Sequence, residues 1–240
     1  MRILLTGHKG FIGSHVYEHL TRIGYDVYGL DRPDDIGDFT DVQDDYDIVI
    51  HLAAYAALRD SVKNPNKFWE NNVEKSQPIF DYCRKYNVRL LYASSAGAHG
   101  WWQNPYAITK KVNEIQAPPN SVGMRFFNVW AEKGSREDML YRMLQDNTAE
   151  YLTRHKRDWI HVHDVVRAIC YLIPDKFRGV LDIGTGKNYS VLELAMRMGK
   201  SDLPILEDTP NEPDSLCADT TQLTKLGWFP TIDIMDLLHG

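Results

Sequence analysis

The feature that most constrains the fold lies at the start of the chain, where a short apolar segment runs directly into closely spaced glycines. Residues 1–5 are predicted to form a buried strand, and residues 11–22 have the apolar periodicity of an amphipathic helix, which Gly24 would end. A strand that turns at once into a helix leaves the first N–H groups and the positive end of the helix dipole facing the turn. The start of the chain is therefore predicted to bind an anionic group.

Three glycines spaced three residues apart make this prediction more specific. Gly7 permits a tight turn, Gly10 lets the backbone approach a pyrophosphate, and Gly13 allows the helix to pack closely on the strand. This spacing between a strand and a helix is typical of a dinucleotide-binding turn. Besides the glycines, the residues expected to contact the cofactor here are Lys9, Phe11 and Ile12.

The residue that follows the second strand indicates which dinucleotide is bound. Residues 26–30 alternate as a strand and end on Asp31, 18 residues after Gly13. An acidic residue at this place accepts hydrogen bonds from the ribose hydroxyls and would repel a 2′-phosphate, so it favours NAD over NADP. Arg32 beside it and Lys9 in the glycine turn keep NADP as an alternative.

Further buried strands predict an α/β fold. Residues 47–54 form a continuous apolar run, as a parallel strand buried on both faces requires, and residues 121–128 are predicted as another strand. Residues 88–93 form a third, which delivers Ser94 and Ser95 to its carboxyl end. That edge of an open α/β sheet is where ligands bind.

Helical segments complete the predicted architecture, a Rossmann-type doubly wound parallel sheet with a smaller C-terminal substrate-binding lobe. Asn64-Pro65 predicts the start of a helix that continues to about Tyr86. Residues 1–130 are predicted to form the NAD(P)-binding core, and residues 131–240 mostly the lobe, with one hydrophobic core shared between them. Helices are expected in the lobe over residues 139–147, 162–172 and 191–198.

Tyr106 and Lys110 form the main candidate for chemistry. Four residues apart, they lie on one face of a predicted helix that must stop by Ala117, because two prolines follow. A tyrosine is a useful base near neutral pH only if its phenolate is stabilised, and a neighbouring lysine together with a cationic nicotinamide would lower its pKa. The same spacing also occurs by chance on surface helices. The interpretation of Tyr106 and Lys110 as a reactive pair therefore depends on where the pair falls among the other motifs of the chain.

Taken in order, these motifs resemble the extended short-chain dehydrogenase/reductases, and specifically the NAD-dependent epimerase/dehydratase family of nucleotide-sugar enzymes. The likeness covers nearly the whole chain and rests on the glycine turn, Asp31, His51-Leu52-Ala53-Ala54, Asn72-Val73, Ser94-Ser95, Tyr106-x-x-x-Lys110, Arg125-Phe126-Phe127-Asn128-Val129, residues 157–165 and Gly184-Thr185-Gly186.

The resemblance implies roles for single residues. Tyr106 would be the catalytic acid/base, Lys110 would bind the nicotinamide ribose and tune Tyr106, and Ser95 would hydrogen-bond the reacting sugar oxygen. Asn128 and Arg157 fall where family members hold the phosphates of the substrate. Further cofactor contacts are implied for Asp38 and Phe39 at the adenine, and for Leu52, Ala53, Ala54 and Asn72.

Departures from the family pattern narrow the function. Ala96 and Gly97 stand where family dehydratases place acidic groups, which disfavours a 4,6-dehydratase. Thr209 takes the place of a second phosphate-binding arginine in many relatives, so either Arg154 or Lys156 substitutes or the substrate is not a typical nucleotide diphosphate sugar. The loops around the Tyr106 helix and the helix itself are short. Because relatives commonly dimerise through this helix and the Asn72 helix, the shortening argues against the homodimer that the resemblance implies.

Composition and charge exclude other classes. A net charge of -6 with no long basic run argues against a nucleic-acid partner, and no stretch approaches the roughly 20 apolar residues of a membrane span. We therefore expect a cytoplasmic enzyme with no membrane partner. Three scattered cysteines predict no disulfide framework, and His161 and His163 have no evident third ligand, so no metal is expected.

The predicted function is NAD-dependent epimerisation of a nucleotide sugar by transient oxidation at C4. Two alternatives remain from the sequence. An NADPH-dependent keto-sugar reductase would use the same serine, tyrosine and lysine once, without returning the hydride. A catalytically silent NAD(P)-binding regulatory protein would account for the trimmed loops and for Thr209.

Overall fold

A six-stranded sheet with helices on both faces forms the larger part of the fold. In the computed structural model, which describes residues 1–32, 34–39, 45–207, 209 and 211–237, the strands follow the order β2-β1-β3-β4-β5-β8. Neighbouring strands β1, β2, β3 and β4 are parallel. The strand bounds are β1 Arg2–Thr6, β2 Asp26–Leu30, β3 Ile48–His51, β4 Arg89–Ser95, β5 Ser121–Phe126 and β8 Gly179–Ile183. The predicted Rossmann-type α/β fold is confirmed.

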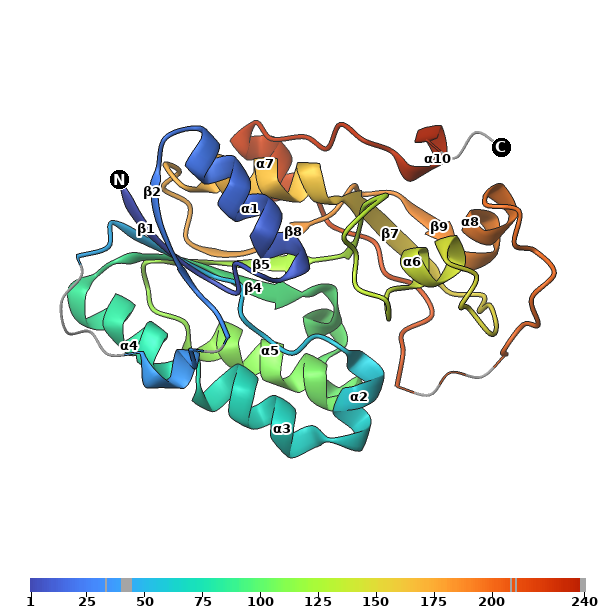
Figure 1. Ribbon diagram of the computed structural model, residues 1–240, viewed down its shortest axis with the longest axis horizontal. Coiled ribbons are helices and arrows are strands. Elements are labelled where there is room, and N and C mark those ends of the chain that lie inside the picture. Colours follow the sequence, from blue (N-terminus) through green and yellow to red (C-terminus); the bar gives the residue numbers. More distant parts are fainter. Residues whose placement is uncertain (33, 40–44, 208, 210, 238–240) are drawn as a thin grey trace. The chain divides into compact units, whose positions relative to one another are not determined.

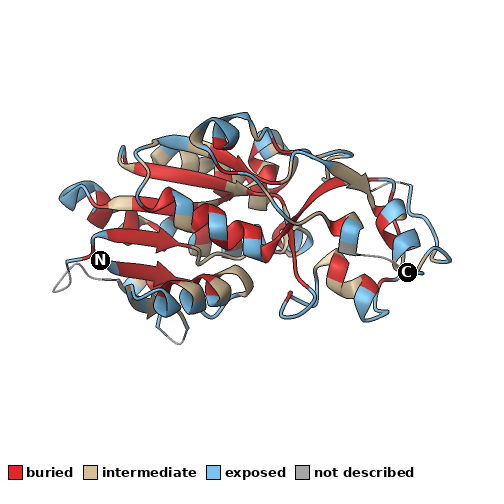
Figure 2. Cartoon of the chain, turned by 90° about the horizontal axis from the view of Figure 1, so that it is seen from above, coloured by how far each residue is buried: buried red, intermediate tan, exposed pale blue. Residues whose placement is uncertain are grey.

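Apolar faces explain how the helices cover this sheet. Helix α1 (Phe11–Arg22) buries Val16 and Leu20 and, with α7 (Val162–Leu172), covers one face (Figure 1). Helices α3 (Pro65–Trp69), α4 (Gln77–Tyr86) and α5 (Pro105–Gln116) cover the other face. Figure 2 shows buried residues along the strands of the sheet. Strands β1, β3, β4 and β5 are buried along most of their length, whereas in the edge strand β2 only Leu30 is buried. A parallel sheet buried in this way requires the continuous apolar runs that the sequence contains.

The helix expected from residue 65 to Tyr86 is interrupted. Pro65 does open α3, but a wide π-helical turn, η2 (Glu70–Glu74), separates α3 from α4. Asn72 lies within this turn and is fully buried. A single-turn π-helix often marks a functional position, because it redirects the side chains of an otherwise regular helix. A further short helix, α2 (Leu58–Lys63), precedes α3 and was not predicted.

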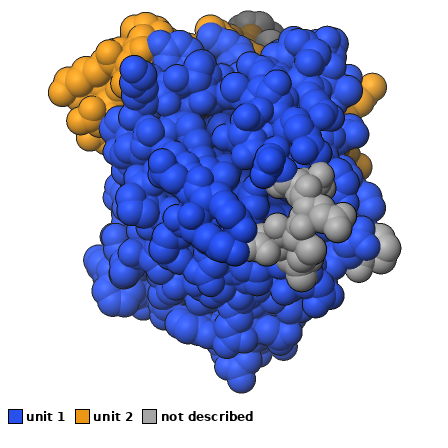
Figure 3. Space-filling model, turned by 90° about the vertical axis from the view of Figure 1, so that its left-hand side faces the viewer, with its two compact units in different colours: residues 1–125, 166–181 blue, residues 126–165, 182–240 orange. Residues whose placement is uncertain are grey.

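The chain divides into two compact units. Unit 1 comprises residues 1–125 and 166–181, and unit 2 comprises residues 126–165 and 182–240. Figure 3 shows unit 1 in blue and unit 2 in orange. Residues 166–181 lie in the range predicted to be mostly the C-terminal lobe, but they group with the first unit. The Arg89 guanidinium, from β4, explains part of this grouping, because it donates hydrogen bonds to the carbonyls of Leu172 (3.0 Å) and Phe177 (3.2 Å).

Unit 2 has its own three-stranded sheet, in the order β6-β7-β9. The strand expected over residues 121–128 in fact changes sheets: β5 ends at Phe126, the Phe127 N–H donates to the Ile183 carbonyl, and Asn128 begins β6. The elements of this unit are β6 Asn128–Trp130, β7 Lys156–His161, β9 Asn188–Ser190, α6 Leu140–Gln145, α8 Val191–Arg197, α9 Thr221–Leu226 and α10 Ile234–Leu237.

The predicted helices after residue 130 are all present, with α6 and α8 shorter than expected. Helix α8 begins with a capping box in which Ser190 and Glu193 each hydrogen-bond the other's backbone N–H. No helix in the described part of the chain has the length and apolar character needed to cross a membrane.

Candidate active site

The glycine turn has the geometry that the sequence predicts. Gly7 has a positive φ of 74°, and a Cβ there would lie 2.7 Å from the Ala53 nitrogen. A Cβ on Gly13 would lie 2.0 Å from the Gly7 carbonyl oxygen, so only glycine lets α1 pack so closely on the turn. Gly10 is exposed and caps α1 without a side-chain hydrogen bond, while Phe11 and Ile12 are half-buried in the first turn. The exposed Gly10 thus lies at the N-terminus of α1, and a helix N-terminus is a favourable position for an anionic group.

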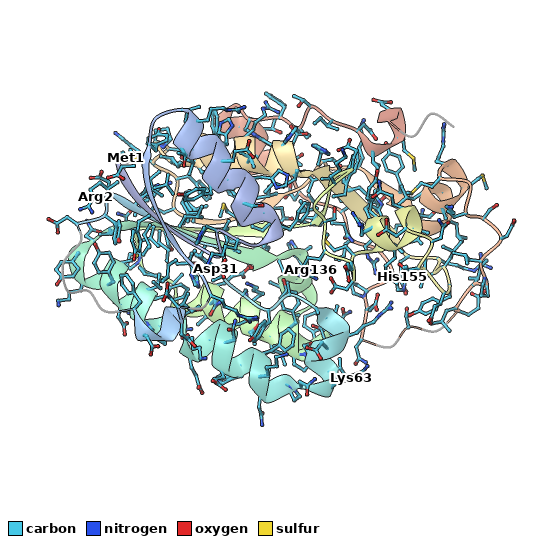
Figure 4. The ribbon with its side chains drawn as sticks, in the orientation of Figure 1. Met1, Arg2, Asp31, Lys63, Arg136 and His155 are labelled. Carbon is cyan, nitrogen blue, oxygen red and sulfur yellow. The ribbon has the colours of Figure 1, made fainter. Side chains whose placement is uncertain are left out.

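Asp31 is fixed at the end of β2 by backbone donors. Its Oδ2 accepts the Lys9 N–H and its Oδ1 accepts the Arg32 N–H, both at 2.8 Å. The two nearby cations have local partners as well: Lys9 Nζ donates to the Arg32 carbonyl at 2.6 Å, and the Arg32 guanidinium lies 5.0 Å from the centre of the Tyr55 ring. Figure 4 labels Asp31 directly after β2. The carboxylate is therefore oriented before any ligand arrives.

The segment expected at the adenine begins with a short 3-10 helix, η1 (Ile36–Asp38), in which Asp38 is exposed. Phe39 is half-buried and packs edge-on against Tyr82, with ring centres 5.4 Å apart. Sequence reasoning missed Asp35, which caps η1 by accepting the Gly37 N–H and forms a 2.6 Å ion pair with Lys75. The hydrogen bond from Lys75 lowers the pKa of Asp35. This ion pair ties η1 to the residue that follows the π-helical turn.

The Leu52-Ala53-Ala54 segment leaves β3 as a half-buried loop that polar side chains hold in place. The Leu52 N–H donates to the Thr6 carbonyl (3.1 Å), and the Ala53 N–H donates to the Thr6 Oγ (3.2 Å). Asn72 secures the next residue, since its Oδ1 accepts the Tyr55 N–H (2.8 Å) and its Nδ2 donates to the Tyr55 carbonyl (2.9 Å). Asn72 thus acts on the loop, and its direct cofactor contact stays a prediction.

Ser95, Tyr106 and Lys110 come from neighbouring elements. Ser95 ends β4, and its Oγ accepts the Gly97 N–H at 3.2 Å. Lys110 on α5 donates from Nζ to the carbonyl of Ala93 in β4 (2.9 Å), and the same Nζ lies 5.9 Å from the centre of the Tyr106 ring. The structure therefore joins the helix that carries the tyrosine and lysine to the strand that carries the serine.

The buried environment of Lys110 changes the pKa of its ammonium group. Lys110 is only 2% exposed, and burial lowers the pKa of its ammonium from 10.5 to about 8. The group is therefore still mostly protonated at neutral pH. A cation held close to the Tyr106 ring in a dry environment stabilises a phenolate more strongly than an exposed lysine would.

Three supporting side chains around this group were not found from the sequence. Ser61 on α2 is fully buried and its Oγ accepts the Tyr106 N–H at 3.1 Å, while the Oδ1 of Asn104 caps α5 by accepting the Ala107 N–H at 2.9 Å. Glu114 pairs with both Nε and Nη2 of Arg125 at 2.7 and 2.8 Å and accepts the Ser94 hydroxyl. Of these three, only Asn104 could have been found from the sequence, because an asparagine directly before a proline is typical of a helix N-cap.

Asn128 and Arg157 both belong to unit 2. Asn128 begins β6 opposite Trp159 and is half-buried. Arg157 is buried, and its guanidinium donates to His155 Nδ1 (2.8 Å) and to the Lys156 carbonyl (3.0 Å). The other ring nitrogen of His155 lies 2.6 Å from the Thr209 Oγ. Since the guanidinium already has partners within the unit, its phosphate role stays a prediction.

His161 and His163 lie in two different elements. β7 ends at His161, and His163 lies in the first turn of α7, where its N–H donates to His161 Nδ1 at 3.3 Å. His161 Nε2 lies 3.1 Å from a carboxylate oxygen of Glu132. Among the residues that the structure describes, no three histidine, cysteine or acidic side chains are grouped to hold a metal.

Comparison with known proteins places this geometry in a family. The model of the NAD dependent epimerase/dehydratase family matches residues 3–184. A UDP-glucose 4-epimerase of Lactobacillus helveticus is 26% identical, over an alignment that covers 98% of this chain and 94% of that protein. Protein CapI of Staphylococcus aureus is 27% identical, over an alignment that covers 79% of this chain and 76% of that protein.

Solved structures are similar over almost the entire chain. MoeE5 in complex with UDP-glucuronic acid and NAD superposes with a TM-score of 0.86 and 27% identity, covering 99% of this chain and 96% of that chain. TunA, described as an NAD dependent NDP-hexosamine 5,6-dehydratase, superposes with a TM-score of 0.88 and 25% identity, with 99% and 95% covered.

Proposed function

Because this chain belongs to the NAD dependent epimerase/dehydratase family, we propose that it is a nucleotide-sugar epimerase that retains NAD and inverts a sugar carbon by transient oxidation at C4. The 4-epimerase from Lactobacillus helveticus and the UDP-sugar complex of MoeE5 support a nucleotide sugar as the substrate class. Unit 1 would bind the cofactor and carry the reacting side chains. Unit 2, with Asn128 and Arg157, would hold the nucleotide diphosphate.

The residues of unit 1 fit NAD. The Gly7 and Gly13 positions have no room for a Cβ, and Gly10 is exposed at the start of α1, as a closely approaching pyrophosphate requires. Asp31 presents an oriented carboxylate for the ribose hydroxyls, and the hydrogen bond from Lys9 Nζ to a backbone carbonyl reduces its availability for a 2′-phosphate. These features favour NAD over NADP. When bound, NAD would supply the hydride acceptor and, later, the hydride donor.

The side chains of this chain would supply orientation and proton transfer. Ser95 would hydrogen-bond the sugar hydroxyl that reacts, and Tyr106 would take the proton from that hydroxyl and later return it. Lys110 would stabilise the phenolate of Tyr106 by its charge, since its ammonium is buried beside the ring. The observation that carries the proposal is this Lys110–Tyr106 pair, tied to the strand that ends in Ser95.

The two residues that follow Ser95 favour epimerisation over the related dehydration. TunA, which has a similar structure, is described as a 5,6-dehydratase. The family resemblance implies that its 4,6-dehydratases carry acidic groups directly after the serine. This chain has Ala96 and Gly97 at those positions. Epimerisation needs no such acid, because no water is lost.

The proposal is tested by the ligand content and turnover of the purified protein. Mass spectrometry of the ligands released on denaturation should find NAD(H), and UDP-sugars should be epimerised without added cofactor. Tyr106→Phe should lower kcat by roughly 10²- to 10⁴-fold while NAD is retained. The matched variant Tyr86→Phe, on the exposed face of α4, should keep full activity.

Three results would contradict this function. Steady consumption of NADPH with an added 4-keto sugar would identify a reductase. Cofactor binding without turnover of a panel of nucleotide sugars would identify a silent binding protein. Unchanged epimerisation by Tyr106→Phe would remove the mechanism.

A further inference from the structure

A buried histidine that the proposed chemistry does not use lies between the glycine turn and the catalytic helix. His51 ends β3 and is 4% exposed. Its Nδ1 lies 2.7 Å from the Thr6 Oγ, and its Nε2 lies 3.0 Å from the Ser76 Oγ. Both ring nitrogens therefore have a hydroxyl partner.

The partners of these hydroxyls determine where the His51 proton resides. The Ser76 hydroxyl donates to the carbonyl of Asn72 at 2.8 Å, so the Ser76 Oγ can only accept from the ring. His51 must then carry its proton on Nε2 and accept at Nδ1 from the Thr6 hydroxyl. The Thr6 Oγ in turn accepts the Ala53 N–H. The hydrogen bonds run in one direction from Ala53 to Asn72, and each hydroxyl in the series both donates and accepts.

One arm of this series reaches the predicted cofactor turn. Thr6 is the last residue of β1, directly before Gly7. The Ala53 nitrogen, which Thr6 holds, is the atom that a Cβ on Gly7 would meet at 2.7 Å. The Thr6 arm thus fixes the two segments that face each other at the glycine turn.

The other arm reaches α5, which carries Tyr106 and Lys110. The Asn72 carbonyl that accepts from Ser76 also accepts from Asn113 Nδ2 at 2.9 Å. Asn72 Nδ2 donates to the Thr109 Oγ at 3.2 Å, and the Thr109 hydroxyl donates to the Tyr106 carbonyl at 2.7 Å. Asn113 and Thr109 both lie within one helical turn of Lys110. The Ser76 arm thus fixes the π-helical turn against the catalytic helix.

We propose that His51, as a neutral imidazole protonated on Nε2, is a positioning residue that sets the cofactor turn through Thr6 and the catalytic helix through Ser76. This role rests on the proposed function, because it assigns cofactor binding to one arm and turnover to the other. It makes a prediction that a purely structural histidine does not, namely that the two arms can be separated.

Two substitutions each keep one arm. In His51→Asn, the side-chain oxygen can take the acceptor position of Nδ1 and keep the Thr6 arm. In His51→Gln, the longer side chain can donate at the position of Nε2 and keep the Ser76 arm. We expect His51→Asn to lower kcat on the order of tenfold with the Kd for NAD nearly unchanged, and His51→Gln to raise that Kd on the order of tenfold with a smaller loss of kcat.

Further variants control for a general loss of stability. Thr6→Val should reproduce the weaker NAD binding of His51→Gln, and Ser76→Ala should reproduce the lower kcat of His51→Asn. The pair His19→Asn and His19→Gln, on α1 outside the series, should change neither quantity. NAD binding is measured by titration calorimetry on protein stripped of cofactor, so this readout does not depend on turnover.

The tautomer of His51, and with it the direction of these hydrogen bonds, can be measured directly in the wild-type protein. Long-range ¹H–¹⁵N correlation spectra distinguish the tautomers of histidine, and they should show His51 neutral with its proton on Nε2 at pH 7. A proton on Nδ1, or on both nitrogens, would overturn the inference. So would equal losses of kcat and NAD affinity in the Asn and Gln variants. If the wild-type protein binds no NAD, the proposed function fails and the cofactor arm with it, whereas parallel losses in an active enzyme overturn only the positioning role.

Discussion

At the scale of single residues, burial shifts the pKa of two basic side chains in unit 1, those of His51 and Lys110. Burial lowers the pKa of His51 from 6.5 to about 3, with the Lys110 charge as a second cause, and burial lowers the pKa of Lys110 to about 8. The two groups differ in what this means at pH 7. His51 is neutral there, whereas Lys110 holds a charge in the interior. This buried charge costs stability, and the proposed mechanism would use it to stabilise the phenolate of Tyr106.

The cost of this charge predicts how stability depends on pH. Below about pH 8, Lys110 is protonated in both the folded and the unfolded state, and the folded protein bears the full cost of the buried charge. Between about pH 8 and 10.5 the unfolded state binds the extra proton, so this group makes the free energy of unfolding rise with pH, by up to about 1.4 kcal/mol per pH unit.

Lys110→Met isolates this contribution. Relative to the variant, the wild-type protein should gain stability from pH 8 to pH 10, as measured by urea unfolding at each pH. If the two stability curves run parallel over this range, Lys110 is not a destabilised buried cation.

Ser61 offers a test of positioning by a neutral residue. It is fully buried, and its Oγ accepts the Tyr106 N–H. Ser61→Ala leaves that N–H without this acceptor, which should cost about 1–3 kcal/mol of stability. Because Tyr106 then loses one of the contacts that hold it, kcat should fall while KM changes little. Ser201→Ala, at an exposed site, serves as the control, and a change confined to KM would contradict the assignment.

Sequence reasoning reached the residues whose chemistry is local and missed those whose role depends on distant partners. The positive φ at Gly7 and the close approach at Gly13 follow from the spacing of the glycines. Ser61 gives no such signal, because its partner is 45 residues away and only the packing of α2 against α5 brings them together. Asn72 was found as part of a motif, but the inward direction of its amide follows from the π-helical turn.

At the scale of elements, β2 and the glycine turn are matched through one close contact. A Cβ on Gly29 would lie 2.6 Å from Cγ of His8, whose ring also packs against Tyr17 of α1 with ring centres 5.4 Å apart. The atom is at the base of the imidazole, so the whole ring would have to move. Gly29 in the second strand is therefore required by the histidine in the turn.

A double-mutant cycle should detect this match. Gly29→Ala alone should destabilise the protein by about 1–3 kcal/mol through overpacking. In the presence of His8→Ala the same change should cost much less, giving a coupling energy above about 0.5 kcal/mol by denaturant unfolding. Additive effects would show that His8 yields to the new methyl group without cost.

The element boundaries that sequence could not give are those set by tertiary contact. The strand predicted over residues 121–128 runs through the change from β5 to β6, because both strands are largely buried and differ in the strands they pair with. The shortness of α5, in contrast, follows from Pro118 and Pro119 and is confirmed, since the helix ends at Gln116.

At the scale of the whole molecule, the chain is a shortened version of its relatives. The alignment with the Lactobacillus helveticus epimerase extends over 310 positions, more than the 240 residues of this chain, so it crosses gaps in this chain. The fold is nevertheless retained, as the TM-scores above 0.85 against MoeE5 and TunA show.

The interleaved order of the units predicts the behaviour of fragments. A fragment of residues 1–130 contains the glycine turn, Tyr106 and Lys110, but it lacks β8 beside β5 and the carbonyls that Arg89 holds. We expect it to show no cooperative thermal unfolding and to aggregate, because the edge of β5 is left unpaired. Circular dichroism and light scattering test this, with the full chain as the control. A soluble fragment that unfolds cooperatively and binds NAD would contradict it.

The contact of Arg89 with the carbonyls of Leu172 and Phe177 also has a consequence for folding during synthesis, because it joins segments that are made at different times. Residues 166–181 leave the ribosome after residues 126–165, so β8 cannot join the sheet beside β5 until that whole segment has been synthesised, however early the glycine turn emerges. Pairings between such distant segments are slow to form. The edge of β5 therefore stays unpaired while the segment between β5 and β8 is synthesised, and an unpaired strand edge exposes a nascent chain to aggregation.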